Sequence, residues 1–281
     1  MKNLATDAIK RPVIWALLLP EAGFRSQVMG LAEALNALVH GTLIEKNVDM
    51  RAPWRYFPST LCPLPLVGLT SNSDPLVAPW PDLVIGCGRR TIPLALAIKR
   101  ASTGVTKAVF IQDAKAAAPK FDLVFPMHHD GLHGPNVIAV DTALHRVTPE
   151  KLARGCDQWR ARFEGLERPL IGVLLGGSTA SLRFTEACAL DLVAKLERLA
   201  RDSGAGFVIT PSRRTDHEAL AVIRHFASRQ PNTWLWDGQN DNPYFGILGL
   251  SNALIVTEDS VSMVSEALVA GKPVATVPLE G

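Results

Sequence analysis

The sequence contains no closely spaced cysteine pair, no basic tail and no interleaving of basic with aromatic residues. None of its four cysteines, Cys62, Cys87, Cys156 and Cys188, forms a CxxC pair. This spacing argues against a zinc site or a disulfide framework and favours a reducing compartment such as the cytoplasm. The 29 basic and 27 acidic residues are spread along the chain and leave a net charge of +2. A nucleic acid is therefore not an expected partner.

Long apolar runs are also missing, since no stretch approaches the roughly 20 apolar residues that a membrane-spanning helix needs. The N-terminal sequence MKNLATDAIKRPVIWALLLPEAG places a basic stretch before an apolar run, as a secretory signal peptide does. However, that run is short, no clear A-x-A cleavage site follows it, and the chain continues into a glycine-containing turn and an amphipathic helix. We interpret residues 13–19 as a first β-strand. We expect a cytoplasmic protein in which any membrane contact is peripheral, at the inner membrane face.

The sequence does contain a regular alternation of short apolar segments with amphipathic helical segments. In the first half we expect strands at 13–19, 42–48, 82–86 and 107–112, short strands near 123 and 137, and helices at 27–39 and 91–102. In the second half we expect strands at 170–175, 206–210, 233–236, 253–256 and 274–277, with helices between them. This alternation predicts an α/β fold with two Rossmann-like parallel-sheet domains facing a cleft.

The domain boundary is expected in the charged segment TPEKLARGCDQWRARFEGLERP. We predict an N-terminal domain over residues 1–150, a linker helix over 151–168 and a C-terminal domain over 169–281. Because the last predicted strand lies at residues 274–277, we expect the C-terminal domain to lack closing helices. Because ligands of open parallel sheets bind beyond the carboxyl ends of the strands, the cleft between the domains is the expected binding site.

A long connection over residues 50–81 contains seven prolines together with large apolar side chains. A loop of this length is either functional or disordered, and its apolar content argues against disorder. One interpretation is that residues 54–66 form a surface that contacts lipid headgroups or a protein partner. The other interpretation is that the connection folds back over its own domain.

Polar groups follow two predicted strands of the second half at their carboxyl ends. After IGVLL, Gly176 and Gly177 let the backbone approach a ligand, and Ser178 adds a hydroxyl. After FVIT, Arg213 and Arg214 can bind phosphate through paired hydrogen bonds. Taken singly, a glycine pair is usually a turn, and adjacent arginines are usually solvated or salt-bridged. Their occurrence at successive strand ends favours a phosphate-bearing ligand.

A third strand end, after ALIV, opens a helix in the segment TEDSVSMVSEALVAGKP. Asp259 or Ser260 can serve as the N-cap, and the start of the helix favours an anion. Ser262 and Glu266 share a face, which we expect to be directed away from the core. Ser262 alone is a common helix-start hydroxyl; with the other loops, we expect hydroxyls to bind phosphate and Glu266 to bind ribose. Tyr244 or its neighbouring phenylalanine can stack on a nucleobase, although aromatic residues at helix starts are more often core.

In the first half, glycine turns precede two predicted helices without matching the dinucleotide-binding GxGxxG spacing. PEAGFRSQ places a turn before one helix, and GCGRRTIP places two arginines before the other. FIQDAK ends a strand with a carboxylate that can act as a general base. We assign five residues of these segments to an acceptor side of the site: Gly23, Gln27, Arg89, Arg90 and Gln112.

Three histidines in MHHDGLHGPN raise the question of a metal site. Two glycines and a proline in the same stretch argue against a helix that would hold these histidines on one face, so we expect no metal. We expect His129 or Asp130 to line the site as an acid–base group instead. The candidate catalytic residues are therefore Asp113, from FIQDAK, and His129.

Many long segments occur in an order that identifies a resemblance: PDLVIGCGRRTIPLALAIKR, IQDAK, FDLVFPMHHD, GPNVIAVDTALHRVTPEKL, LLGGST, TPSRRT and NPYFGILGLSNALIVTEDSVSMVSEALVAGKPV. They resemble the mitochondrial fission Elm-type family, which is named for a plant mitochondrial-surface protein. The family has many bacterial members, often labelled nucleoside-diphosphate-sugar epimerases. The chain keeps Gly23 and Gln27 of the family's K-x-G-x-x-x-Q pattern without its lysine, and it reads QDA where QDP is expected.

The resemblance implies a glycosyltransferase-B-like fold in which Ser260, Ser262 and Glu266 grip a nucleotide diphosphate and its ribose. It implies an enzyme that takes a nucleotide sugar as substrate, without a further cofactor, and transfers the sugar to an unknown acceptor held by the first domain. Ser178, Arg213 and the helix start at Ser260 would stabilise the leaving diphosphate, with Asp113 or His129 as base. Two alternatives stay open: nucleoside-diphosphate-sugar epimerisation in the same cleft, and a non-catalytic fission-type adaptor.

Overall fold

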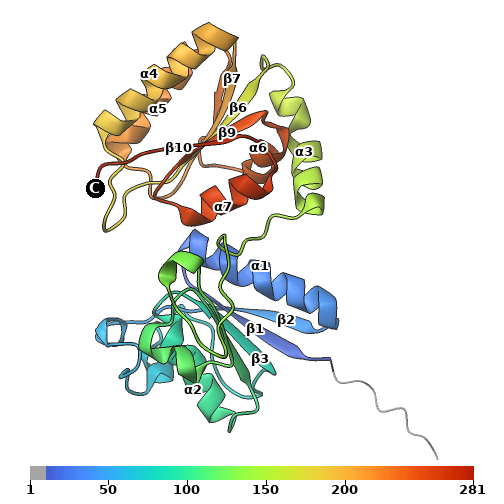
Figure 1. Cartoon of the computed structure of the whole chain (residues 1–281), viewed down its shortest axis with the longest axis vertical. Helices are drawn as coiled ribbons and strands as arrows, with labels where there is room; N and C mark the ends of the chain where they lie inside the picture. Colours follow the sequence, from blue (N-terminus) through green and yellow to red (C-terminus); the bar gives the residue numbers. More distant parts are fainter. Residues whose placement is uncertain (1–10) are drawn as a thin grey trace, which may run out of the picture. The chain divides into compact units, whose positions relative to one another are not determined.

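The chain folds into two compact α/β units in the computed structural model, which describes residues 11–281 (Figure 1). The units comprise Met1–Arg146 and Val147–Gly281. Residues 1–10, which carry the basic stretch of the signal-peptide alternative, lie outside the described residues. Within residues 11–281, no helix is both long enough and apolar enough to cross a membrane.

The first unit is built on a five-stranded parallel sheet in the order β2-β1-β3-β4-β5. Its strands are β1 (Val13–Leu18), β2 (Thr42–Asn47), β3 (Leu83–Cys87), β4 (Lys107–Ile111) and β5 (Leu123–Phe125). Its helices are α1 (Ala22–Val39) and α2 (Thr91–Ala101). Near residue 137, where a short strand is expected, the structure has two isolated bridges. Val137 pairs with Val124 of β5, and Val140 pairs with Met127 just after it.

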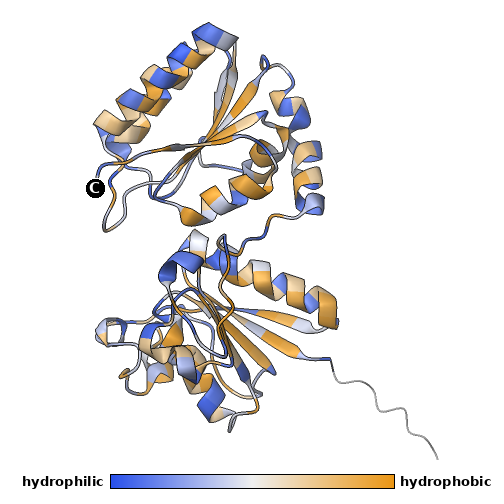
Figure 2. Cartoon of the chain, in the orientation of Figure 1, coloured by the Kyte–Doolittle hydropathy of each residue, from blue (hydrophilic) through white to orange (hydrophobic). Residues whose placement is uncertain are grey.

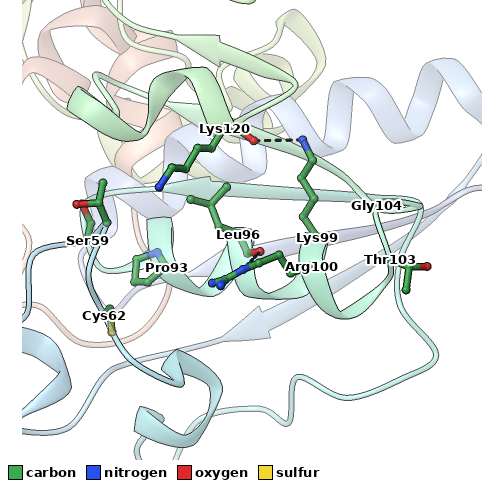
Figure 3. A pocket seen from close by; sticks show the side chains of 10 residues that line it. Ser59, Cys62, Pro93, Leu96, Lys99, Arg100, Thr103, Gly104 and Lys120 are labelled. Atoms are coloured by element: carbon green, nitrogen blue, oxygen red, sulfur yellow. Dashed lines mark hydrogen bonds between the residues drawn. The ribbon is translucent and has the colours of Figure 1, made fainter.

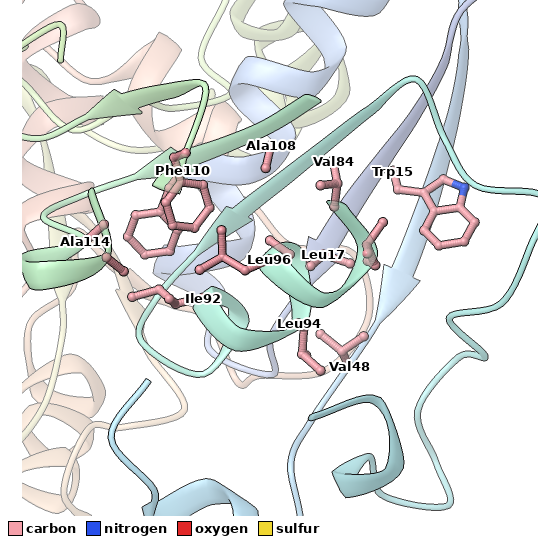
Figure 4. Packing of buried hydrophobic residues seen from close by; sticks show 14 of the residues in the cluster. Trp15, Leu17, Val48, Val84, Ile92, Leu94, Leu96, Ala108, Phe110 and Ala114 are labelled. Atoms are coloured by element: carbon pink, nitrogen blue, oxygen red, sulfur yellow. The ribbon is translucent and has the colours of Figure 1, made fainter. Parts of the chain in front are cut away.

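Side chains of β1 alternate between two apolar cores, one on each face of the sheet. Trp15 and Leu17 pack with residues of α2 such as Leu94, in the cluster that Figure 4 shows. Ile14 and Leu18 pack instead with residues of α1. This alternation follows from the two-residue period of a strand, and helices on both faces explain why the strand is apolar throughout. Each such buried side chain stabilises the fold by about 1.5–3 kcal/mol.

Helix α1 begins earlier than its apolar pattern predicts. It starts at Ala22, after Glu21 in an extended conformation, so Gly23 lies in its first turn and not in a turn before it. Its first turn is mixed in character, since Phe24 packs against the apolar cores whereas Arg25 pairs with the neighbouring strand β2. The Arg25 guanidinium lies 2.9 Å from Oε2 of Glu45 in β2.

The second unit repeats this plan with a parallel sheet in the order β10-β9-β6-β7-β8. Its strands are β6 (Leu170–Leu175), β7 (Gly206–Pro211), β8 (Thr233–Leu235), β9 (Ala253–Thr257) and β10 (Val274–Val277). Its helices are α3 (Pro149–Phe163), α4 (Glu186–Ser203), α5 (His217–Arg229), α6 (Tyr244–Leu250) and α7 (Val261–Val269). The predicted α/β class with two parallel sheets is confirmed.

The central strand β6 is buried along its whole length and serves two cores. Ile171 and Val173 pack with residues of α4 and α5. Leu170 and Leu174 pack on the opposite face with residues of α3, α6 and α7. The colouring by hydropathy in Figure 2 follows this pattern, with hydrophobic strands inside and hydrophilic residues along the outer helices.

The helix expected as a linker, α3, packs closely on α6 within the second unit. A Cβ at Gly155 would lie 2.7 Å from the backbone carbon of Phe245, so the two helices meet backbone to backbone at this point. Trp159 stacks on Phe163, with ring centroids 5.8 Å apart, and also contacts Trp234. The unit boundary between residues 146 and 147 therefore precedes this helix.

The long connection between β2 and β3 folds back over its own unit. It contains two short 3-10 turns, Trp54–Tyr56 and Pro65–Gly68. The indole Nε1 of Trp54 donates to the Pro63 carbonyl at 2.9 Å, and Leu66 packs against the core. Other apolar side chains of residues 54–66, including Leu61 and Leu64, stay exposed. We call residues 54–66 the apolar segment.

Candidate functional site at the carboxyl edge of the second sheet

Three loops of the second unit lie together because strands β9, β6 and β7 are neighbours in the sheet. The Gly176 N–H, after β6, donates to Oγ1 of Thr257 in β9 at 2.7 Å. The Ser212 hydroxyl, after β7, donates to the Gly176 carbonyl at 2.7 Å. The loop after β6 is thus bonded to the end of β9 on one side and to the loop after β7 on the other.

Close packing of these loops accounts for the two glycines. A Cβ at Gly176 would overlap the carboxylate of Asp259. A Cβ at Gly177 would overlap the backbone carbonyl of Arg214, which cannot turn aside as the end of a flexible side chain can. Any larger residue at either position would therefore push the loops apart.

An acidic side chain, Asp259, occupies the point where the three loops meet. Its side chain is 0% exposed, and its Oδ2 lies 2.8 Å from Nη2 of Arg214. The same oxygen accepts a hydrogen bond from the Gly177 N–H at 3.1 Å. The buried Oδ1 has no hydrogen-bond partner among the described residues. An arginine and a backbone N–H thus converge on one carboxylate, which is an arrangement that binds anions.

The sequence pattern presents Asp259 only as an alternative N-cap of α7. In the structure the cap is Ser260, whose Oγ accepts a hydrogen bond from the Met263 N–H at 3.4 Å. The only sequence signal for the role of Asp259 is its position directly after a buried strand and beside an arginine-bearing loop. That signal is weak, because it depends on knowing which strands are neighbours.

The predicted phosphate residue Ser178 is engaged inside its own loop. Its hydroxyl donates to the carboxylate of Asp216 and accepts a hydrogen bond from the Phe184 N–H at 3.1 Å. Asp216 is the residue before α5, so this contact ties the loop after β6 to the start of that helix. Arg213 is exposed in the loop after β7.

Helix α7 buries the polar face that its sequence predicts to be directed away from the core. Ser262 and Glu266, expected to be directed away from the core, are 8% and 6% exposed. On another side of the helix, Val261 and Leu268 are 46% and 53% exposed, whereas Val264 packs against the core. The polar face can be buried because a residue from a distant part of the chain provides a hydrogen bond to it.

The distant residue is Tyr244 at the start of α6. Its hydroxyl donates to Oε2 of Glu266 at 2.6 Å. Burial and the negative charge of Glu266 raise the pKa of Tyr244 well above its usual value, so the phenol keeps its proton. The ring of Tyr244 packs in the core edge-to-face against Phe245. The phenol therefore orients a buried carboxylate.

In the first unit, the predicted acceptor-side residues hold the strand ends together. Arg90 donates to Oδ1 of Asp49 at 2.8 Å and also pairs with Glu21. Gln27 is buried, and its Oε1 accepts a hydrogen bond from Sγ of Cys87 at 3.8 Å. These contacts link the ends of β1, β2 and β3.

Of the other three acceptor-side residues, Gly23 lies in the first turn of α1, and Arg89 and Gln112 form hydrogen bonds to backbone carbonyls. Nη2 of Arg89 donates to the Arg55 carbonyl at 3.2 Å. Gln112 has a positive φ of 82° directly after β4, and its N–H donates to the Phe125 carbonyl at 2.8 Å. Both residues therefore shape the carboxyl edge of the first sheet.

The two candidate catalytic residues follow the neighbouring strands β4 and β5. Oδ2 of Asp113 lies 2.6 Å from Nζ of Lys115, and this contact raises the pKa of the lysine. The His129 ring is exposed, with Nε2 3.8 Å from Oδ1 of Asp130. No cluster of His, Cys, Asp or Glu within residues 11–281 is arranged to hold a metal ion.

Comparison with known sequences decides the family. A family model described as Mitochondrial fission ELM1 matches residues 22–281. The chain belongs to the mitochondrial fission ELM1 family. The Arabidopsis thaliana mitochondrial fission protein ELM1 is 30% identical over 222 residues, which cover 70% of this chain and 51% of that protein. This chain therefore spans about half the length of that ELM1 relative.

A second relative is an uncharacterized protein of Rickettsia prowazekii. It is 24% identical over 299 aligned residues, which cover 92% of this chain and 81% of that protein. The family model, which matches residues 22–281, confirms the ELM1 family resemblance expected from the sequence motifs.

Solved structures show the fold of this ELM1 family member. A glycosyltransferase from Rickettsia africae superimposes with a TM-score of 0.51 at 13% identity, covering 95% of this chain and 79% of that one. The UDP-GlcNAc 2-epimerase of Neisseria meningitidis, bound to UDP-GlcNAc, has a TM-score of 0.54 at 14% identity, with 94% and 82% covered. The Methanocaldococcus jannaschii UDP-GlcNAc 2-epimerase has a TM-score of 0.56 at 9% identity, with 94% and 83% covered. The fold is therefore glycosyltransferase-B-like, as predicted.

Proposed function

We propose that this chain binds a nucleoside diphosphate sugar at the carboxyl edge of its second sheet and transfers the sugar to an acceptor. The observation that carries the proposal is the convergence of Arg214 and the Gly177 N–H on Asp259, beside the start of α7. Donors that hold a buried carboxylate have the chemistry needed to hold a phosphate at the same edge. Arg213, exposed in the same loop, supplies a second guanidinium.

Glu266 supports the sugar side of the proposal. It lies one helical turn beyond Ser262, and Tyr244 orients its carboxylate through the 2.6 Å hydrogen bond. A carboxylate held in this way can accept hydrogen bonds from the hydroxyls of a ribose. We assign Ser260 and Ser262 to the diphosphate, Glu266 to the ribose, and Tyr244 to the positioning of Glu266.

Sugar transfer needs stabilisation of the negative charge that develops on the departing diphosphate. We assign this role to Arg213, to the N–H groups at the start of α7, and to Ser178, whose hydroxyl would exchange its hydrogen bond to Asp216 for one to the diphosphate. Deprotonation of the acceptor is assigned to Asp113 or His129. Lys115 engages Asp113, whereas the His129 ring is exposed. Loss of turnover in Asp113→Asn or in His129→Ala, with unchanged nucleotide binding, would identify the base.

Thermal unfolding of the full chain with a panel of nucleoside diphosphates and nucleotide sugars tests the proposal. A ligand that binds only the folded state stabilises it by about 2.7 kcal/mol at a hundredfold excess over Kd, so one nucleotide is expected to raise Tm. Arg213→Ala is expected to weaken its binding roughly tenfold or more, because a charge-assisted hydrogen bond to phosphate is lost. Glu266→Gln is expected to weaken it through the ribose.

A matched control is Arg224→Ala, which removes an exposed arginine on α5 of the same unit. It is expected to leave the nucleotide-dependent rise in Tm unchanged. If no nucleotide raises Tm of the correctly folded chain at millimolar concentration, the catalytic proposal fails. The adaptor role suggested by the family name would then take its place.

Epimerisation of the same nucleotide sugar is the second candidate function. The chain superimposes on two UDP-GlcNAc 2-epimerases. Because one fold can support several reactions, we keep epimerisation as the alternative to sugar transfer. The two reactions differ in their need for an acceptor. A new epimer that forms from the nucleotide sugar alone, detected by NMR, supports the epimerase. Release of nucleoside diphosphate that depends on an added acceptor supports the transferase.

A further inference from the structure

The apolar segment leaves large apolar side chains on the surface of the first unit. Leu61 and Leu64 are 73% and 75% exposed. Their neighbours Trp54 and Leu66 pack against the core of the unit. One side of the segment therefore contacts the core, while Leu61 and Leu64 face the solvent. Leucines held outward in this way suit a partner that removes them from water.

Acidic residues are absent from the parts of the chain that build this region. Residues 50–73 and 83–112 contain seven lysines and arginines and no aspartate or glutamate, in a chain whose net charge is only +2. Some of these cations are neutralised from elsewhere, as Lys99 is by Asp122 at 2.6 Å. Four cations of these ranges, Arg51, Arg55, Arg89 and Arg100, form no ion pair with any described residue, and neither does the nearby Lys120. The region therefore carries an uncompensated positive charge.

A cavity of about 570 Å³ lies between the apolar segment and α2. Its walls include Ser59 and Cys62 of the apolar segment, Leu96 and Arg100 of α2, and Lys120. Figure 3 shows the Arg100 guanidinium and the Lys120 ammonium both directed toward the side on which Ser59 and Cys62 lie. Cations and apolar side chains in one cavity suit an anionic headgroup that is attached to an apolar body.

We propose that this face of the first unit docks on an anionic lipid bilayer. Leu61 and Leu64 enter the interface between headgroups and acyl chains, as the apolar side chains of peripheral amphipathic elements do. A headgroup phosphate binds Arg100 and Lys120 in the cavity, and the remaining cations are attracted to the negative surface. Every residue involved belongs to the first unit, so the inference does not rest on the proposed nucleotide site.

The arrangement of the cations favours a bilayer over a protein surface. The Arg51 guanidinium lies 5.1 Å from the ring centroid of Trp54, and that of Arg55 lies 5.9 Å from the ring of Tyr56. Residues 51–64 contain two arginines, three aromatic side chains and the two exposed leucines, without any acidic residue. A bilayer offers continuous negative charge above a continuous apolar layer, which matches this combination of cationic and apolar side chains.

Co-sedimentation of the full chain with vesicles tests the inference. We compare phosphatidylcholine vesicles with vesicles that contain about 30 mol% phosphatidylglycerol, and expect binding to the anionic vesicles that weakens as salt is raised. Arg100→Gln with Lys120→Gln is expected to lower the partition constant roughly fivefold per cation removed. Leu61→Ser with Leu64→Ser is expected to lower it roughly tenfold per leucine.

Matched controls come from the second unit. Leu190→Ser removes a leucine that is 54% exposed on α4, and Arg224→Gln removes an exposed arginine on α5. Both are expected to leave vesicle binding unchanged. All four variants change exposed or cavity-lining side chains, and an unchanged Tm establishes that each is folded.

Three results would overturn the inference. The first is the absence of binding of the folded wild-type chain to anionic vesicles at low salt, which would leave this face to a protein partner. The second is equal binding of the wild type and the apolar-segment variant. The third is complete displacement from the vesicles by millimolar inorganic phosphate, which would make the cavity a site for free phosphate.

Discussion

At the scale of single residues, Asp259 occupies the point at which we propose that the loops of the second unit bind an anion. It holds Arg214 and the Gly177 N–H through one oxygen, while its other oxygen lacks a partner among residues 11–281. Two anions near one guanidinium repel each other. We therefore expect Asp259 and a ligand phosphate to compete for Arg214, so that the carboxylate weakens binding while it stabilises the unliganded loops.

Asp259→Asn is expected to change stability and affinity in opposite directions. The variant loses a buried charge-assisted hydrogen bond, so urea unfolding should show a free energy lower by about 1–2 kcal/mol. The Kd for the nucleoside diphosphate that raises Tm should fall roughly threefold or more, because Arg214 is released. A loss of both stability and affinity would contradict competition and would show that Asp259 only positions Arg214.

Tyr244 is expected to make stability depend on alkaline pH. Folding raises its pKa, so above about pH 10 the unfolded state loses a proton that the folded state keeps. Stability should therefore fall as pH rises through this range, by up to about 1.4 kcal/mol per pH unit from this one group. Tyr244→Phe should remove this part of the slope, measured by urea unfolding between pH 9 and about pH 11.

The second tyrosine of the chain provides the control. Tyr56 is 73% exposed, and Tyr56→Phe should leave the alkaline slope as it is in the wild type. At neutral pH, Tyr244→Phe should also cost about 1.5–3 kcal/mol, because a hydrogen bond to the buried Glu266 is lost. Identical alkaline slopes for wild type and Tyr244→Phe would contradict the role of burial and of Glu266.

At the scale of secondary-structure elements, the packing of α3 on α6 depends on glycine. A Cβ at Gly155 would lie 2.7 Å from the Phe245 backbone, and one at Gly246 would lie 2.7 Å from Cβ of Trp159. Backbones in such close contact bury the aromatic cluster around Trp159 against the sheet. The apparent linker helix thus becomes part of a core.

Gly155→Ala is expected to destabilise the second unit. Alanine has a helix propensity about 1 kcal/mol better than that of glycine, but forced separation of two packed helices costs typically 1–3 kcal/mol. We expect a lower Tm, measured by calorimetry. Gly165→Ala, at a position with nothing within 4 Å of the added methyl, should not lower it. A gain in Tm for Gly155→Ala would show that α3 is free to move away from α6.

Helix α7 shows the limit of periodicity at the same scale. The pattern correctly separates a polar from an apolar face, but it does not say which face is buried. Normally the apolar face is buried; here Glu266 is buried with Tyr244 as partner, and Leu268 is exposed. The partners are 22 residues apart in the sequence, beyond the reach of a helical pattern.

At the scale of the whole molecule, two units repeat one plan with different surface chemistry. Each places polar loops after the carboxyl ends of its strands, in the glycosyltransferase-B-like fold that the solved structures share. The first unit also carries the apolar segment, and residues 50–73 and 83–112 around it contain no aspartate or glutamate. The proposed nucleotide site and the proposed lipid-docking face lie on different units, so each can be altered separately.

The sequence by itself determined the alternation of strands and helices, the class of the fold and the three loops of the second unit. These features follow from local patterns, because burial on two faces makes a strand apolar throughout and right-handed crossovers bring the carboxyl ends of parallel strands to one edge. Tertiary structure alone decided that Asp259 fills the meeting point of the loops and that α7 buries its polar face. Both depend on contacts between distant residues, such as Gly177 with Asp259, 82 positions apart. Local periodicity carries no information about such pairs.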